Sequence, residues 1–120
     1  MNSAGDSLQC HPVLLKLLEP GEEIEHATTA GEAILAVTTR RIAVVDQERT
    51  ALDIAIDRLR RVQFDIEKTR PATLVLVPES PHDNPQVLAV KPEEYEAVSA
   101  ALVTIGLRLA ERGQDAEAVG

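Results

Sequence analysis

Aromatic side chains are almost absent from this sequence, which has no tryptophan and only Phe64 and Tyr95 in 120 residues. A hydrophobic core must therefore be built mainly from valine, leucine, isoleucine and alanine, within a hydrophobic content of 44%. Cysteine is equally scarce. Because Cys10 is the only one, an intrachain disulfide is excluded, and we expect a reducing, cytoplasmic location. The length suffices for one domain with one core.

Long apolar runs and positive charge are also lacking. No apolar stretch approaches the roughly 20 residues that a membrane-spanning helix needs. Residues 1–6 lack the basic start and apolar run of a secretory signal. The chain has 12 Lys and Arg against 20 Asp and Glu, a net charge of −8. Because such a surface repels phosphate groups, we expect no nucleic-acid partner, and the charge disfavours an anionic membrane lipid.

Motifs that carry chemistry are missing as well. Cys10-His11 has no second pair of ligands, whereas zinc needs three or four at ordered spacing. Ser80, His82 and Asp83 are neighbours in one proline-bounded loop, which is a poor basis for a catalytic triad. The sequence also contains no nucleophile elbow and no glycine-rich phosphate loop. We therefore expect no catalytic residues, no metal site and no cofactor.

The central feature that is present is a hairpin between Glu32 and Asp46. Two short runs rich in strand formers, 34–37 and 42–45, flank the polar tetrad Thr38-Thr39-Arg40-Arg41. This pattern predicts two strands joined by a tight turn. Because both runs are apolar on both faces, we expect cover on both sides or a strongly curved sheet.

Further strands are expected on either side of this hairpin. Residues 51–57 and 61–67 alternate apolar and polar side chains, which is typical of half-exposed strands. In the weaker first strand, His26 faces the core as a partly buried, hydrogen-bonded histidine and Glu25 faces water. With the central pair, these segments make seven strands: residues 22–29, 32–37, 42–46, 51–57, 61–67, 72–77 and 86–90.

Two helices complete the expected elements. Residues 12–19 form a short amphipathic helix, and a long helix runs from Pro92 to about Arg112, where Gly113 is a natural stop. Its core stripe consists of Tyr95, Val98, Leu102, Ile105 and Leu109. We expect a single domain at 11–112 between flexible tails at 1–10 and 113–120.

This order of elements is that of the pleckstrin-homology-like barrel. The sequence resembles the short bacterial pleckstrin-homology-like domains and their GRAM-like relatives at Leu18-Glu19-Pro20-Gly21-Glu22, Leu35-Ala36-Val37-Thr38-Thr39-Arg40-Arg41-Ile42 and Ile54-Ala55-Ile56 through Leu59. The resemblance covers residues 14–112. It implies a mainly β fold, a barrel of about seven antiparallel strands closed by one C-terminal helix, with a short N-terminal helix. Closure of a bent sheet removes its exposed edges.

Two departures from the lipid-binding members of this family concern function. Those domains have a basic loop between the first two strands and usually a tryptophan in the final helix. Here the loop is Ala30-Gly31, this chain has no tryptophan, and acidic residues surround the loop at Glu22, Glu23, Glu25 and Glu32. We therefore do not expect phosphoinositide binding at the usual site.

An arginine cluster is the first candidate site. It consists of Arg40, Arg41, Arg58, Arg60 and Arg61. In one interpretation these arginines form a patch that binds an anionic lipid headgroup or small ligand. In the other, which we favour, they are solvated side chains paired with the neighbouring acids Asp46, Asp53, Asp57, Asp65 and Glu67.

A second apolar face of the long helix is the other candidate site. Ala100, Val103, Leu107 and Ala110 line up away from the core stripe. Either the short N-terminal helix packs there through Leu14 and Leu17, or the face binds a protein partner or a second copy. Our leading hypothesis is a non-catalytic protein-interaction or oligomerisation module. The alternative is a peripheral binder of an anionic ligand.

Overall fold

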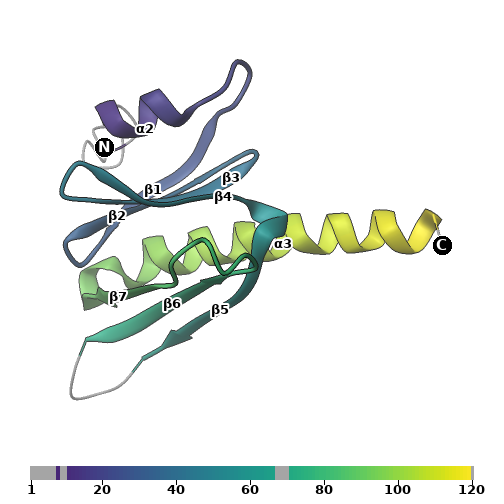
Figure 1. The fold of residues 1–120 in the computed structure, drawn as a ribbon. Helices are drawn as coiled ribbons and strands as arrows, with labels where there is room; N and C mark the ends of the chain where they lie inside the picture. Colours follow the sequence, from purple (N-terminus) through teal and green to yellow (C-terminus); the bar gives the residue numbers. More distant parts are fainter. Residues whose placement is uncertain (1–7, 9–10, 67–70, 120) are drawn as a thin grey trace.

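The computed structural model describes residue 8, residues 11–66 and residues 71–119, with the side chains of the last helix described as far as residue 111. Seven antiparallel strands form two sheets (Figure 1). The four-stranded sheet has the order β1 (Ile24–Ala30), β2 (Ala33–Thr38), β3 (Arg41–Asp46), β4 (Arg49–Ala55). The three-stranded sheet has the order β5 (Leu59–Asp65), β6 (Ala72–Pro78), β7 (Gln86–Val90).

Two helices and two 3-10 turns complete the fold. Helix α2 (Pro12–Leu17) precedes the first sheet, η1 (Ile56–Arg58) joins the two sheets, and η2 (Pro92–Glu94) leads into α3 (Tyr95–Val119). The predicted mainly β class, with seven strands, a C-terminal helix and a short N-terminal helix, is confirmed. The segment predicted as a turn at 68–71 lies outside the described residues, apart from Pro71.

The predicted hairpin is the centre of the first sheet. β2 and β3 pair in register from Ala33 opposite Asp46 to Val37 opposite Ile42, and each has a further strand on its other edge. Alternate side chains point to opposite faces. The inward set is fully buried and forms the main core with Ile56, β6 and α3; it includes Leu35, Val37, Ile42 and Val44.

The outward set of the same hairpin is covered by α2. Leu14 of α2 packs on Ala36, Ala43 and Val45, with Leu17 and Ile24 at the edge of this second cluster. The expected cover on both faces of the hairpin is therefore confirmed. The alternative that α2 packs on the second apolar face of the long helix is wrong, because α2 and α3 lie on opposite sides of the first sheet (Figure 1).

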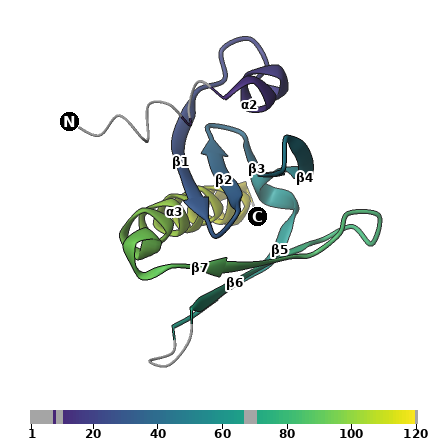
Figure 2. The same ribbon diagram turned by 90° about the vertical axis from the view of Figure 1, so that its left-hand side faces the viewer.

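The predicted closed barrel is not closed. The two sheets are separate ladders, and η1 turns the chain out of the first sheet before β5 begins. On the other side, α3 lies between β1 and β7, so a helix fills the gap that strand pairing would have closed (Figure 2). The helix thus substitutes for closure and does not merely stopper a finished cylinder.

Polar contacts fix α3 along β1. His26 Nε2 is 2.7 Å from Thr104 Oγ1, which confirms a partly buried, hydrogen-bonded histidine. Glu25 pairs with Arg108, so the prediction that Glu25 faces water is wrong. The register of β1 shifts between Ile24 and His26. Such an irregularity changes which face successive side chains reach.

Helix α3 is longer than the sequence predicts. Gly113 keeps a helical backbone and the helix continues to Val119, so the prediction that it ends near Arg112 is wrong. A glycine stops a helix when it adopts a left-handed conformation, whereas glycine inside a helix costs only about 1 kcal/mol relative to alanine. The C-terminal end of α3 extends past both sheets (Figure 1).

The turn between β1 and β2 is held against β7 and the start of α3. Gly31 has φ +66°, and a Cβ atom there would lie 2.5 Å from the carbonyl oxygen of Ala89. Its N–H donates to Glu94 Oε1 at 3.0 Å, and the same oxygen accepts from the N–H of Lys91 at 2.9 Å. Thr29 Oγ1 donates to the other carboxylate oxygen of Glu94. This buried carboxylate therefore joins the first hairpin to the last helix.

Replacing Gly31 with alanine tests this arrangement. We expect Gly31→Ala to lower the free energy of unfolding by about 2 kcal/mol or more, because the added Cβ meets backbone and the left-handed conformation becomes strained. Gly106→Ala is the matched control. A Cβ at Gly106 meets nothing within 4 Å, so this variant should gain up to about 1 kcal/mol of helix propensity. Urea unfolding at low protein concentration measures both, and equal effects would contradict the account.

Candidate functional site

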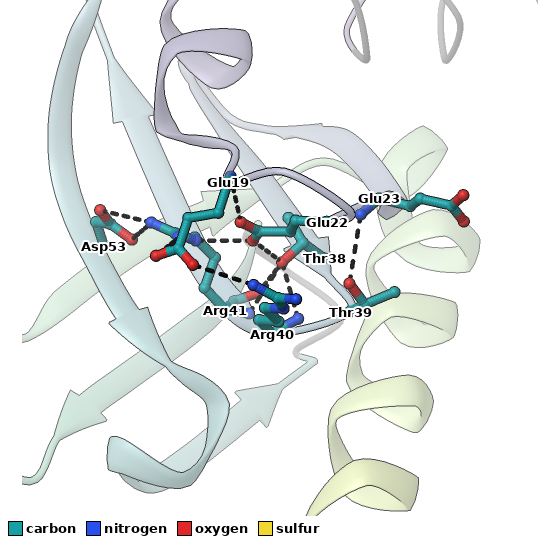
Figure 3. A network of polar contacts seen from close by, with 8 residues as sticks. All are labelled: Glu19, Glu22, Glu23, Thr38, Thr39, Arg40, Arg41 and Asp53. Atoms are coloured by element: carbon teal, nitrogen blue, oxygen red, sulfur yellow. Dashed lines mark hydrogen bonds and ion pairs between the residues drawn. The ribbon is translucent and has the colours of Figure 1, made fainter.

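Two of the sequence stretches that carry the family resemblance meet in one polar network. Glu22 precedes β1, and Arg41 begins β3 (Figure 3). Arg41 Nε donates to Glu22 Oε2 at 2.7 Å, and the Glu22 side chain is fully buried. The backbone N–H of Glu19 donates to Glu22 Oε1 at 2.9 Å. A buried carboxylate is stable only when donors satisfy it in this way.

Thr38 links this carboxylate to the β2–β3 turn. Its hydroxyl donates to Glu22 and accepts from the backbone N–H groups of Arg40 at 3.0 Å and Arg41 at 2.9 Å. Thr39 completes the junction: its N–H donates to the carbonyl of Glu23 at 2.9 Å. The polar tetrad of the predicted turn therefore determines where the chain enters β1.

The rest of the Arg41 guanidinium is also taken up by acids. Arg41 Nη1 donates to both carboxylate oxygens of Asp53, at 3.0 and 3.2 Å, and Nη2 donates to Glu19 Oε1 at 3.2 Å. The Arg41 side chain is only 15% exposed. Arg40, with a 52% exposed side chain, binds the second oxygen of Glu19 at 3.0 Å. Asp53 is thus one of the acids expected to pair with the arginine cluster.

Protonation in this network follows from its contacts. Burial raises the pKa of Glu22, but hydrogen bonds from Thr38, the Glu19 backbone and Arg41 outweigh burial and hold it below its ordinary value. The hydrogen bond to Glu22 raises the pKa of Arg41 despite desolvation. At neutral pH the two groups therefore form a charged pair.

A shallow hollow of about 280 Å³ lies over this network, lined by Glu19, Arg40, Arg41, Asp53 and Ala55. Two guanidinium groups face three carboxylates in and below it, counting Glu22, which gives 2 − 3 = −1. A phosphate group would have to displace these acids from Arg41. The geometry therefore supports a structural role for Arg40 and Arg41 over anion binding.

The other three arginines of the cluster belong to a different part of the fold. Arg58 lies in η1, and Arg60 and Arg61 lie on β5 of the second sheet. A backbone hydrogen bond of 3.1 Å from Ile56 to Arg40 brings η1 next to the β2–β3 turn. Arg61 lies opposite Val77 on the second sheet. Within the described ranges, no ion pair involves Arg58, Arg60 or Arg61, and all three are exposed.

The second apolar face of α3 is exposed in full. Val103 and Leu107 are 62% and 60% exposed, and Ala100 and Ala110 are exposed beside them. The opposite side of the helix carries Val98, Ala101 and Ile105, each at 0%. No described helix or strand covers the face formed by Ala100, Val103, Leu107 and Ala110, which we call the outer face of α3.

The residues that might suggest catalysis or metal binding have local roles. His11 Nδ1 accepts the N–H of Val13 at 3.2 Å and caps α2, while Cys10 lies outside the described residues. Ser80 Oγ accepts the backbone N–H of His82 at 3.2 Å, which is a turn contact. In the part of the chain that the structure describes, His, Cys, Asp and Glu form no group suited to a metal ion. None of the described helices is long and apolar enough to cross a membrane.

Sequence reasoning missed the two buried carboxylates. Glu22 was taken as a surface acid near the β1–β2 turn and Glu94 as one of several acids at the helix start. A signal existed for Glu94, since Lys91 and Glu94 have the spacing of a capping box, which the structure contains. For Glu22 the sequence offers no comparable local signal, because its main partner is 19 residues away.

Comparison with solved structures identifies a similar fold. The crystal structure of a pleckstrin homology domain from Shewanella amazonensis SB2B superimposes with a TM-score of 0.63 at 18% sequence identity; the match covers 78% of this chain and 92% of that one. At this identity the likeness shows the fold alone, and it confirms the pleckstrin-homology-like fold of this chain. Neither a protein-family model nor a curated protein matches the sequence.

Substituting Glu22 tests the role of the network. Glu22→Gln should cost about 2–4 kcal/mol at pH 7, because it leaves Arg41 without its buried counter-charge. The pKa of Glu22 is lowered by folding, so its stabilisation is present above its ordinary value of 4.5 and is lost as the pH falls through the folded value. The gap between wild type and variant should therefore narrow steadily below about pH 4.5.

Denaturant unfolding between pH 3 and 8 measures this gap, with the exposed neighbour Glu23 as the control. Glu23→Gln should stay within about 0.5 kcal/mol of wild type at every pH. A gap for Glu22→Gln that does not change with pH would show that the charge of Glu22 contributes nothing.

Proposed function

We propose that this chain is a non-catalytic interaction module, and that the outer face of α3 is the surface through which it binds a protein partner or a second copy. The observation that carries the proposal is the exposure of Val103 and Leu107 on the side of α3 opposite its buried stripe. A helix that only covers a gap between two sheets needs one apolar side. Side chains of this kind on the second side are typical of a binding surface.

The remaining surface features are consistent with protein binding. The β1–β2 turn, where lipid-binding relatives carry a basic loop, is here tied to Glu94 and to Ala89. The net charge of −8 opposes adsorption to anionic surfaces. The uncharged outer face of α3 is where such a chain can approach another protein without strong repulsion. A cytoplasmic setting, as expected from the single cysteine, belongs to the same proposal.

Anionic ligand binding is the second candidate function. The observation in its favour is that Arg58, Arg60 and Arg61 are exposed and form no ion pair with another described residue. Three adjacent free guanidinium groups attract phosphate or an anionic headgroup. Arg40 and Arg41 do not belong to this version of the site, because Glu19, Glu22 and Asp53 hold them.

A double substitution on α3 tests the leading proposal. Val103→Glu with Leu107→Glu should abolish binding of a protein partner or a second copy, because two carboxylates replace the centre of the apolar face. Stability should change by no more than about 1 kcal/mol, since both side chains are exposed. Val87→Glu is the matched control, because Val87 is 69% exposed on β7. Sedimentation of the pure chain and quantitative pull-down measure binding; equal behaviour of the two variants would refute the proposal.

Liposome co-sedimentation tests the second candidate. With vesicles rich in anionic lipid, the triple substitution of Arg58, Arg60 and Arg61 by alanine should remove any binding of the wild-type chain. Binding through arginines weakens as salt rises, by screening, whereas association through the neutral face of α3 should strengthen because repulsion between chains of charge −8 is screened. Absence of vesicle binding, or binding that the substitutions do not change, removes this candidate.

A further inference from the structure

We infer that the occupant of the outer face of α3 is the same face of a second copy, packed antiparallel about a two-fold axis near residue 105. This inference rests on the proposed function and names its partner. Ala100, Val103, Leu107 and Ala110 follow one another at spacings of three, four and three residues. Those are the spacings of alternating a and d positions in a helix–helix seam.

The order of side-chain sizes along this seam is self-complementary. Two larger side chains, Val103 and Leu107, lie between two alanines. In an antiparallel pair centred on residue 105, Val103 faces the partner's Leu107 and Ala100 faces the partner's Ala110. Each layer then occurs twice, related by the two-fold axis, as an isologous interface requires.

Charge selects the antiparallel over the parallel arrangement. Glu96 is exposed one helical turn before Ala100, on the same side of the helix. A parallel pair would place it beside the partner's Glu96, and like charges at this spacing repel. In the antiparallel pair, position 96 lies level with position 114 of the second copy, which is a glutamine in the sequence.

Gly106 provides an independent reason for a closely approaching partner. It is exposed beside the seam, and nothing within 4 Å in this chain requires that position to lack a Cβ atom. Glycine there costs about 1 kcal/mol of helix propensity. In the antiparallel pair, the two copies of Gly106 lie next to the two-fold axis, about 3 Å apart along it at 1.5 Å per residue. The missing Cβ atoms allow the two backbones to approach there.

The seam is short, which limits the strength of the pair. From Ala100 to Ala110 it extends about 15 Å along the helix. Stable interfaces bury roughly 800 Å² on each partner, more than one such seam provides, so we expect a dissociation constant of roughly tens to hundreds of micromolar. The bodies of the two copies lie on opposite sides of the paired helices, because the buried stripe of α3 faces away from the seam.

Cysteine cross-linking tests the geometry directly. In a Cys10→Ser background, one preparation carries Ala100→Cys and another Ala110→Cys. Mixed at about 200 μM and treated with a short bis-maleimide, they should give at least about five times more cross-linked dimer than either alone, since antiparallel packing places these positions together. Val87→Cys in the same background gives the baseline for random collision. Circular dichroism verifies that each variant is folded.

The outcomes separate this inference from the proposed function. Strong cross-linking of each preparation alone means parallel packing and overturns the antiparallel arrangement. Baseline cross-linking of the mixture, with a monomer by sedimentation up to 1 mM, overturns self-association. If Val103→Glu with Leu107→Glu then still abolishes binding of a different protein that wild type and Val87→Glu retain, the proposed function stands without this inference. If it does not, both fail.

Discussion

The buried pair of Glu22 and Arg41 is the constraint on which the first half of the structure depends. Glu22 lies just before β1, and its carboxylate is satisfied by Arg41, Thr38 and the Glu19 backbone. Removing any of these donors leaves charge in a site that water does not reach. The pair therefore determines how α2 joins the sheet, and α2 in turn covers the outer face of the central hairpin.

The same pair explains why a short arginine-rich turn is not by itself a ligand site. Arg41 holds Glu22 and Asp53 and reaches Glu19, so its charge is already neutralised within the fold. A second buried carboxylate, Glu94, plays the equivalent part at the other end of the β1–β2 hairpin, where it joins Gly31 to the start of α3. With both ends of that hairpin committed to structure, the surface left for binding is the outer face of α3, together with the exposed arginines of η1 and β5.

Patterns local in sequence predicted much of the fold. The β2–β3 hairpin was predictable because strand formers flank a polar tetrad, and the start of α3 because Pro92 precedes three acids. The helix end was not, since Gly113 tolerates a helical backbone. The site of α2 was not either, because amphipathicity shows which side of a helix is apolar but not which surface it meets. Barrel closure failed for a related reason: the strand order does not show that α3 occupies the gap.

The candidate sites divide in the same way. The outer face of α3 was predictable from spacing, whereas the role of Arg41 depends on Glu22 and Asp53, 19 and 12 residues away. A double-mutant cycle for Glu22 and Arg41, using Glu22→Gln and Arg41→Met, tests the central claim most directly. The account predicts a coupling free energy of about 2 kcal/mol or more, against at most about 0.5 kcal/mol for the exposed pair of Glu19 and Arg40. Equal coupling energies for the two pairs would contradict it.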